Sequence, residues 1–388
     1  MSGVNYMEKL LRGIKVEWKL LGEVSKVLRG KRLTRSQLSD NEKFPVYHGG
    51  LEPLGYYGMS NRPANTTMVI NVGASAGTVG YSSVDFWSSD GCFCIEHSAL
   101  LVNKFLYYFL IGYQHFLRSK VRVAGIPTLD AFVVEKIEIP IPPLHVQSEI
   151  VRILDNFTEL TAELTAELHA RKKQYTFYRD KLLTFEDGEV EWKTLGEVGE
   201  FVRGNGLQKS DFRESGVGCI HYGQIYTYYN TFAYKTKSFV SLVLANKLRK
   251  AQKGDLIIAT TSENIEDVCK PLVWLGEDEV CVSGETYIFK HNQNPKYLAY
   301  YLQTPMFFDF KKRNRTGTKV IRVHGDKLAE FQIPLPSLEE QERIVSILDK
   351  FDALTTSMTE GLPREIELRQ KQYEYYRNLL LTFPKAEA

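Results

Sequence analysis

Basic side chains gather with tyrosine and amide side chains in several short stretches of the sequence. Arginine and lysine neutralise phosphate groups, whereas glutamine, asparagine, histidine and tyrosine can hydrogen-bond to the edges of bases. For any one of these residues a solvated surface role is the alternative, so the prediction of nucleic-acid binding rests on the groups. In the first half of the chain the candidates are Arg29, Lys31, Arg32, Arg35, Gln37, His48, Arg118, Lys120 and Arg122. In the second half they are Asn205, Lys209, Tyr222, Gln224, Tyr226, Lys311, Lys312, Arg313, Arg315, Lys319 and Arg322.

Residue patterns typical of catalytic and metal sites are missing from the sequence. The glycine-rich stretch from Gly73 to Gly80 lacks the lysine of a nucleotide-binding P-loop, and a turn between strands is the alternative. Asn294-Pro295-Lys296 has the wrong third residue for the Asn/Asp-Pro-Pro-aromatic motif of a methyltransferase. The eight histidines are scattered, without the spacing of metal ligands. We therefore predict a chain that is not itself an enzyme and that holds no cofactor and no metal.

Composition narrows the class of protein further. The 388 residues include 49 Lys+Arg and 47 Asp+Glu. This balance excludes a histone-like polycation but not a protein whose basic residues are clustered. The five cysteines are odd in number and form no C-x-x-C, which disfavours a disulfide framework and a zinc ribbon. No apolar run approaches the ~20 residues that span a bilayer. We expect a cytoplasmic protein without a membrane partner.

The chain contains an internal repeat. The segment from Glu17 to Val24 reappears almost unchanged from Glu191 to Val198. A second motif, Ile139-Pro-Ile-Pro142, reappears as Ile333-Pro-Leu-Pro336, and similar helical sequence follows both copies. A fixed self-similarity of this kind indicates two structural copies. The predicted domains are a first head at 1–143, a first helix at 144–185, a second head at 186–337, and a second helix with a C-terminal tail at 338–388.

The two helical stretches each carry a long apolar stripe. Apolar residues recur at alternating steps of three and four, which is typical of a coiled-coil seam. Gly361 and Pro363 interrupt the second stripe, so we expect a break there. We expect the helices to pair antiparallel, with the heads at opposite ends; the alternative is that each helix packs only on its own head. The residues expected to form the seam or to dock partners are Leu154, Phe157, Leu164, Leu168, Tyr175, Tyr178, Leu348, Phe351, Met358, Ile366, Tyr373 and Tyr376.

Both heads have the short apolar runs of β-rich domains. Each run is followed by a small polar loop, and each head then has one aromatic helix. The predicted fold class is therefore α+β: two β-rich heads joined by two long antiparallel helices, with a pseudo-twofold internal repeat. The predicted strands are Met68–Val72, Cys92–Ile95, Leu256–Thr260, Val280–Val282 and Tyr287–Lys290, and the predicted aromatic helices are Lys104–Phe116 and Pro295–Phe310.

These motifs together resemble the specificity subunit of type I restriction–modification systems. The resemblance rests on the repeated Glu-Trp-Lys-x-Leu-Gly-Glu-Val segments, the Ile-Pro-x-Pro motifs, and the runs from Gln147 to Asp155 and from Arg364 to Tyr376. Thr-Ala-Glu-Leu occurs twice in tandem, at 161–164 and 165–168, which is similar to the type IC branch of that family. The resemblance covers the whole architecture, but in the heads it is a resemblance of fold only.

The resemblance implies a function and a set of partners. Each head would be a target-recognition domain that binds one half of a bipartite double-stranded DNA target in the major groove. The helices would fix the unread spacer and dock two methyltransferase subunits, and motor–nuclease subunits would join that core. S-adenosylmethionine and ATP with Mg would then be bound by the partner subunits, and this chain would catalyse nothing.

Two other functions remain open at this point. One is a fused methyltransferase or endonuclease with its own recognition heads, which the missing motifs disfavour. The other is a two-headed adaptor that binds proteins and uses the helices as a dimerisation rod. Salt dependence separates DNA binding from the adaptor, because a protein that contacts phosphates loses affinity steeply as salt rises.

Overall fold

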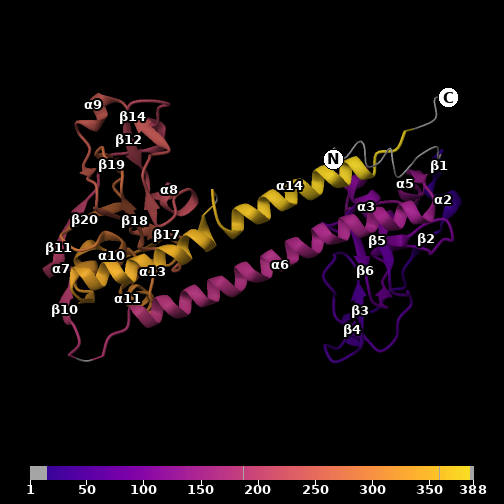
Figure 1. Cartoon of the computed structure of the whole chain (residues 1–388), viewed down its shortest axis with the longest axis horizontal. Helices are drawn as coiled ribbons and strands as arrows, with labels where there is room; N and C mark the ends of the chain where they lie inside the picture. The colour runs from indigo at the N-terminus through magenta and orange to yellow at the C-terminus, as the bar shows by residue number, and fades with distance from the viewer. Residues whose placement is uncertain (1–14, 187, 358, 385–388) are drawn as a thin grey trace. The chain divides into compact units, whose positions relative to one another are not determined.

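The structure is a computed structural model that describes residues 15–186, 188–357 and 359–384. It divides into two compact units (Figure 1). The first comprises the chain up to Leu164 together with the residues from Ile366 onward, and the second comprises Thr165–Glu365. Each predicted head range lies within one unit, whereas the long helix α6 (Leu144–Leu182) contributes to both. Met358, a predicted seam residue, lies outside the described residues.

The first unit is built on short strands around a buried central strand. Its sheets have the strand orders β2-β8-β5-β6, β4-β3-β7 and β1-β9. All five residues of β5 are buried. Its elements are β1 (Glu17–Leu20), α2 (Leu21–Val24), β2 (Val27–Arg29), η1 (Arg35–Gln37), β3 (Phe44–Tyr47), β4 (Tyr56–Tyr57), β5 (Thr66–Ile70), β6 (Val79–Ser82), β7 (Trp87–Ser88), β8 (Cys92–Ile95), α3 (Asn103–Gly112), α4 (Gln114–Ser119), α5 (Ala131–Glu135), β9 (Glu138–Ile141), the start of α6, and most of α14 (Leu362–Leu380).

The second unit has a larger β-structure of the same kind. Its sheets have the orders β11-β20-β16-β18-β13, β14-β12-β19-β15, β10-β22 and β17-β21. Its elements are the end of α6, β10 (Glu191–Thr194), α7 (Leu195–Val198), β11 (Gly199–Arg203), η2 (Lys209–Asp211), β12 (Val217–Ile220), α8 (Tyr222–Thr227), β13 (Phe232–Ala233), β14 (Ser238–Val240), α9 (Leu242–Ala245), β15 (Lys250–Ala251), β16 (Leu256–Ala259), β17 (Thr261–Ser262), β18 (Lys270–Trp274), β19 (Val280–Val282), β20 (Thr286–His291), α10 (Pro295–Tyr301), α11 (Pro305–Asn314), β21 (Ile321–Arg322), α12 (Gly325–Ala329), β22 (Gln332–Leu335) and α13 (Leu338–Thr356).

The repeated motifs pair with each other inside each unit. Trp18 of β1 lies opposite Pro140 of β9, and Trp192 of β10 lies opposite Pro334 of β22. The leucine that follows each opening strand is fully buried, and its amide donates to a carbonyl near the closing strand. The two motifs recur in the sequence because together they close each head where its helix begins.

The aromatic helices differ from the prediction. Each is two helices rather than one: α3 is followed by α4, and α10 by α11. In the second unit the break has a clear cause, because Pro305 has no amide hydrogen and its fixed φ suits the first turn of a new helix. The β-rich heads themselves are confirmed, although β5 covers Thr66–Ile70 rather than the predicted Met68–Val72.

A buried glutamine fixes the first head to its helix. Gln147 of α6 is fully buried. Its Oε1 accepts from the amide of Val102 at 2.8 Å, and its Nε2 donates to the carbonyls of Leu100 and Pro142 at 2.9 and 2.8 Å. Gln341 of α13 does the same in the second unit. Both polar atoms of each buried amide are hydrogen-bonded, so the hydrogen bonds offset the free-energy cost of removing the amide from water.

Two turns further along α6, an aspartate receives two donors from the aromatic helix. Asp155 Oδ2 accepts from Lys104 Nζ at 2.8 Å, and Asp155 Oδ1 accepts from Tyr108 Oη at 2.5 Å. Burial and the hydrogen bond to Asp155 raise the pKa of Tyr108 far above its usual range, so the hydroxyl stays protonated and remains a donor. We call this arrangement the aspartate clamp.

The second unit repeats the aspartate clamp. Lys296 Nζ donates to Asp349 Oδ2 at 2.5 Å, and Tyr300 Oη donates to Asp349 Oδ1 at 2.7 Å. Burial and the Asp349 carboxylate raise the pKa of Tyr300 in the same direction. The same lysine–tyrosine pair, four residues apart on α3 and on α10, therefore holds each head on its helix.

The helical segments pair as predicted within each unit. Phe157 of α6 stacks on Tyr376 of α14 in the first, and Tyr178 of α6 stacks on Phe351 of α13 in the second. The alternative, in which each helix packs only on its own head, is wrong, because Phe383 lies in the core of the first unit.

The remaining predicted seam residues and the predicted helix break can also be located in the structure. Tyr175 lies against the core of the second unit and Tyr373 against that of the first, whereas Leu164, Leu168 and Ile366 are half-buried. Leu154 and Leu348 are fully buried in the head cores. Helix α13 ends at Thr356 and α14 begins at Leu362, and Gly361 has φ +103° between them. Among the described residues, no helix is long and apolar enough to cross a membrane.

The aspartate clamp leads to a stability prediction. Asp155→Asn and Asp349→Asn should each lower the free energy of unfolding by about 2 kcal/mol, because two donors lose a charged acceptor. Thermal unfolding monitored by circular dichroism measures the loss. Glu159→Gln, on the exposed side of α6, is the matched control and should change little. Equal unfolding temperatures for clamp variants and control would contradict this role of the clamp.

Candidate nucleic-acid interface

Each head carries a short hairpin directly after its second aromatic helix. In the first head, Arg122 and Thr128 exchange both backbone hydrogen bonds, at 2.9 and 3.0 Å. In the second head, Thr316 and Arg322 do the same at 2.8 and 2.9 Å. We call residues 122–128 and 316–322 the recognition hairpins. The number of residues between the two hairpins equals the number between the two Ile-Pro-x-Pro motifs. The hairpins are therefore equivalent positions of the repeat.

Each recognition hairpin is tethered to the polar loop after the central strand of its head. The amide of Gly73 donates to Pro127 O at 2.9 Å in the first head. Strand β17 pairs with β21 in the second, with Thr261 opposite Arg322. The polar loops are 71–78 and 260–264. Since β5 and β16 are wholly buried, they fix these loops rigidly beside the hairpins.

In the first head, the turn residue Asp90 holds basic side chains beside the polar loop. The carbonyl of Asp90 accepts from Arg29 Nε at 3.3 Å, and also from Asn71 Nδ2 at 3.3 Å. Its carboxylate lies 3.4 Å from Nδ1 of His48. Two predicted residues from separate segments, Arg29 and His48, therefore lie around one turn next to the polar loop.

Glu285 has the corresponding position in the second head. Its carboxylate lies 3.5 Å from Arg322 Nε and 3.9 Å from Arg203 Nη2, and it also accepts from the hydroxyl of Thr261. The side chain therefore connects the first strand exit, the polar loop and the recognition hairpin. Because one carboxylate faces two guanidinium groups, this cluster of three side chains keeps a net positive charge.

A groove of about 610 Å³ opens beside the second recognition hairpin. Four predicted residues line it: Lys209, Tyr222, Gln224 and Tyr226. Residues that the sequence did not single out also line it, among them Asn264 of the polar loop and Val320 of the hairpin. The structure thus brings these four second-head candidates together on one concave surface.

Three of the second-head candidates hold parts of this head together. Gln224 is 8% exposed, and its amide pairs with the backbone of His221 and with Ser238 Oγ. The hydroxyl of Tyr226 lies 2.9 Å from two backbone carbonyls, and burial raises its pKa far above the usual range. Asn205 bridges Lys247 and Arg249 through their backbone atoms. Gln224 and Tyr226 therefore shape the groove, whereas Lys209 is exposed and Tyr222 is half-buried.

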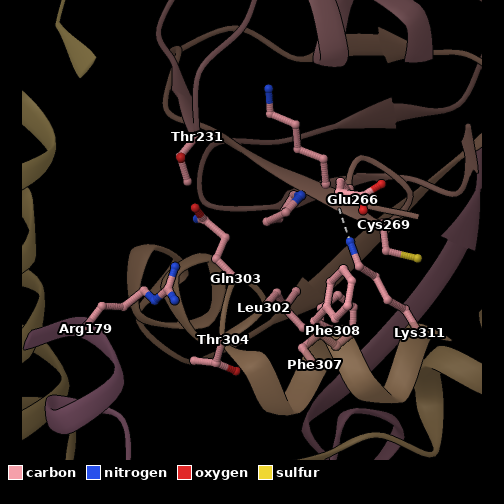
Figure 2. A pocket seen from close by; sticks show the side chains of 12 residues that line it. Arg179, Thr231, Glu266, Cys269, Leu302, Gln303, Thr304, Phe307, Phe308 and Lys311 are labelled. Atoms are coloured by element: carbon pink, nitrogen blue, oxygen red, sulfur yellow. Dashed lines mark hydrogen bonds between the residues drawn. The ribbon is translucent and has the colours of Figure 1, made fainter. Parts of the chain in front are cut away.

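Lys311, a predicted nucleic-acid-binding residue, is buried, unlike its exposed neighbours Lys312 and Arg313. It is 6% exposed, and its Nζ donates to the carbonyl of Glu266 at 2.6 Å (Figure 2). The same Nζ also donates to the carbonyl of Val268 at 2.9 Å. Burial lowers its pKa. The ammonium lies at the wall of a cavity of about 280 Å³. Sequence alone cannot show which lysine of a basic run faces backbone carbonyls.

The remaining predicted residues lie mostly on the surface. Gln37 is exposed, although its Oε1 already accepts from Thr34. Arg122 pairs with Asp130 at 3.0 Å, and Arg118 donates to Thr78. Within the described ranges, no group of three or more His, Cys, Asp and Glu residues could hold a metal ion. The other exposed predicted residues are Arg29, Lys31, Arg32, Arg35, Lys120, Lys312, Arg313, Arg315, Lys319 and Arg322.

The tips of the recognition hairpins were not among the predicted residues. Val123 and Ile126 are 81% and 71% exposed in the first head, and Val320 is 47% exposed in the second. Asn264 was missed as well. Extending the repeat from the Ile-Pro-x-Pro motifs toward the N-terminus would have aligned Arg122–Thr128 with Thr316–Arg322 and so found both hairpins.

The burial of Lys311 leads to a second prediction. Lys311→Met should lower the free energy of unfolding by about 2–3 kcal/mol, because two buried carbonyls lose a charged donor. Urea unfolding measures the effect. Lys312→Met, at the exposed neighbouring position, should stay within about 0.5 kcal/mol of the wild type. If both variants behaved alike, the structural role assigned to Lys311 would be wrong.

Comparisons with known proteins agree with this architecture. The family described as "Type I restriction modification DNA specificity domain" matches residues 14–171 and 188–368. The specificity subunit of the type I restriction enzyme EcoR124I/EcoR124II from Escherichia coli is 36% identical, over 100% of this chain and 99% of that protein. A putative type I specificity subunit from Haemophilus influenzae is 34% identical, over 97% and 98% of the two chains.

A solved structure shares the fold. The crystal structure of the S subunit of a type I restriction–modification system from M. genitalium superimposes with a TM-score of 0.61 at 17% identity, covering 96% of this chain and 97% of that one. The internal repeat, the paired helices and the full-length similarity lead to one assignment. The chain belongs to the type I restriction–modification DNA specificity family.

Proposed function

We propose that this chain is the DNA-recognition subunit of a type I restriction–modification complex. Each head contacts one half of a bipartite double-stranded target through its recognition hairpin and polar loop. The observation that carries the proposal is that two heads of different sequence present the same hairpin, each rimmed by exposed Arg and Lys side chains. Basic rims position a protein on phosphates, and the residues between them meet base edges.

The helices α6, α13 and α14 have two roles in this proposal. They set the distance between the half-sites, and they dock two methyltransferase subunits. Phe177 and Tyr375 are 61% and 60% exposed, which supports docking because large exposed aromatic side chains are enriched at protein interfaces. Motor–nuclease subunits complete the assembly. S-adenosylmethionine belongs to the methyltransferase subunits, ATP and Mg to the motor–nuclease subunits, and the complex acts on DNA in the cytoplasm.

The tandem Thr-Ala-Glu-Leu units allow a direct test of function and spacing together. Deleting Thr165–Leu168 removes about one helical turn, or ~6 Å of α6. Genome-wide mapping of methylated positions, in cells that carry the chain and its partner subunits, should give a bipartite motif for the wild type. The deletion should keep both half-sites and shorten the gap between them.

Two outcomes of this mapping would count against the proposal. A wild-type chain that directs no bipartite methylation would contradict the assignment as a DNA-recognition subunit. An unchanged gap in the deletion variant would contradict the spacing role of the helices alone. As a control, the purified chain without partner subunits should transfer no methyl groups, whereas a fused methyltransferase would.

Salt dependence tests the recognition hairpin of the second head. Lys319→Ala with Arg322→Ala, which removes the two exposed basic side chains within this hairpin, should weaken DNA binding and reduce the salt slope of log K by about 1 for each phosphate that is no longer neutralised. The charge-matched control is Lys253→Ala with Lys327→Ala, which removes two lysines paired with Glu277 and Glu330. Binding of the assembled complex is measured by fluorescence anisotropy at salt concentrations from about 50 to about 200 mM. A slope equal to that of the control would place this hairpin away from phosphates, as expected for a protein-binding adaptor.

A further inference from the structure

The tips of both recognition hairpins carry exposed β-branched apolar side chains. Ile126 in the first head is 71% exposed and Val320 in the second is 47% exposed. Each stands two residues before the residue that closes its hairpin, Thr128 or Arg322. A single exposed apolar residue needs no explanation. The same class of residue at the equivalent place in two otherwise divergent hairpins does need one.

The backbone of each hairpin is fixed, so the tip is presented in a set direction. Two backbone hydrogen bonds close each hairpin, and one glycine in each adopts a left-handed conformation: Gly125 with φ +83° and Gly317 with φ +82°. Further backbone hydrogen bonds join the closing strand to the polar loop. Neither tip is therefore a loose loop that could fold its apolar side chain inward.

The chain segments that carry the tips are rich in basic residues, although Glu263 and Asp267 of a neighbouring segment line the same groove as Val320. In the first head, Arg118 and Lys120 are exposed beside the tip, and Asp130, the one acidic residue of segment 118–130, pairs with Arg122. Segment 311–322 contains no acidic residue. Basic side chains on both sides of an apolar tip suit a polyanion, because arginine and lysine neutralise phosphates. The DNA major groove has phosphates on both rims and, on its floor, the 5-methyl group of thymine, and it admits a two-stranded ribbon.

We propose that each recognition hairpin enters the major groove and that Ile126 and Val320 contact the 5-methyl group of a thymine in their respective half-sites. This inference rests on the proposed function and adds an apolar contact to the polar ones. In the second head, Val320 lines the same groove as Tyr222, so its contact lies next to a hydrogen-bonding side chain. The basic residues then hold the hairpin at the phosphates, and the tip adds a preference for one base.

Replacing thymine with uracil tests the contact, because it removes only the methyl group. The assembled complex of this chain with its methyltransferase subunits is titrated with duplexes that carry the mapped wild-type target. Each thymine is replaced by uracil in turn. One position in each half-site should lose affinity roughly fourfold, the loss expected for one buried methyl group.

Variants of the tips complete the test. Ile126→Ala should bind the thymine duplex roughly tenfold more weakly and become insensitive to uracil in the first head's half-site only, with an unchanged salt slope. Val320→Ala should do the same for the other half-site. The controls are Val84→Ala and Leu242→Ala, which alter exposed apolar residues of the same heads outside the hairpins and should keep the wild-type sensitivity.

The outcomes separate this inference from the proposed function. Tip variants that keep the wild-type ratio of thymine to uracil affinity would overturn it, and so would mapped half-sites without an A·T pair. In either case the wild-type complex would still recognise its target, so the proposed function would stand. A wild-type complex without any bipartite target would overturn both.

Discussion

The attachment of each head to its helix depends on one polar arrangement, which occurs twice. On each helix, a fully buried glutamine accepts a hydrogen bond from the backbone of the head. Two helical turns later, an aspartate accepts hydrogen bonds from the lysine–tyrosine pair of the head. Charged hydrogen bonds of this kind are stronger than neutral ones and also directional, so they fix an orientation as well as a distance. A recognition surface can act at a defined place on DNA only if its head is held rigidly. The clamps provide that rigidity at Asp155 and Asp349.

The two heads combine one backbone plan with different side chains. The paired opening and closing strands, the central buried strand and the recognition hairpin recur in both. The residues around the hairpin differ, since Asp90 gathers Arg29 and His48 in the first head whereas Glu285 gathers Arg203 and Arg322 in the second. A protein that recognises two different half-sites requires this combination. The structural plan positions the surface, and the variable side chains determine what it binds.

The sequence was sufficient to predict structural elements where the pattern of residues is periodic or local. The repeat around Glu17 and Glu191 identified the strands that close the heads, and Gly361 correctly predicted a break, which lies between the end of α13 at Thr356 and the start of α14 at Leu362. Sequence was insufficient where tertiary contacts decide. Lys311 and Lys312 are neighbours of the same type, yet only the first meets buried carbonyls. The apolar tips at Ile126 and Val320 carry no signal until the hairpins are aligned, because isolated valine and isoleucine residues usually indicate core.

The division of the chain into units has a consequence for synthesis on the ribosome. Leu380 and Phe383 belong to the core of the first unit, whereas the second unit is one continuous stretch of chain. At about 5–20 residues per second, translating Thr165–Glu365 takes roughly 10–40 s. Throughout that interval the nascent first head lacks its last core residues and leaves apolar surface uncovered. The head that is made first is therefore the one whose core is completed last.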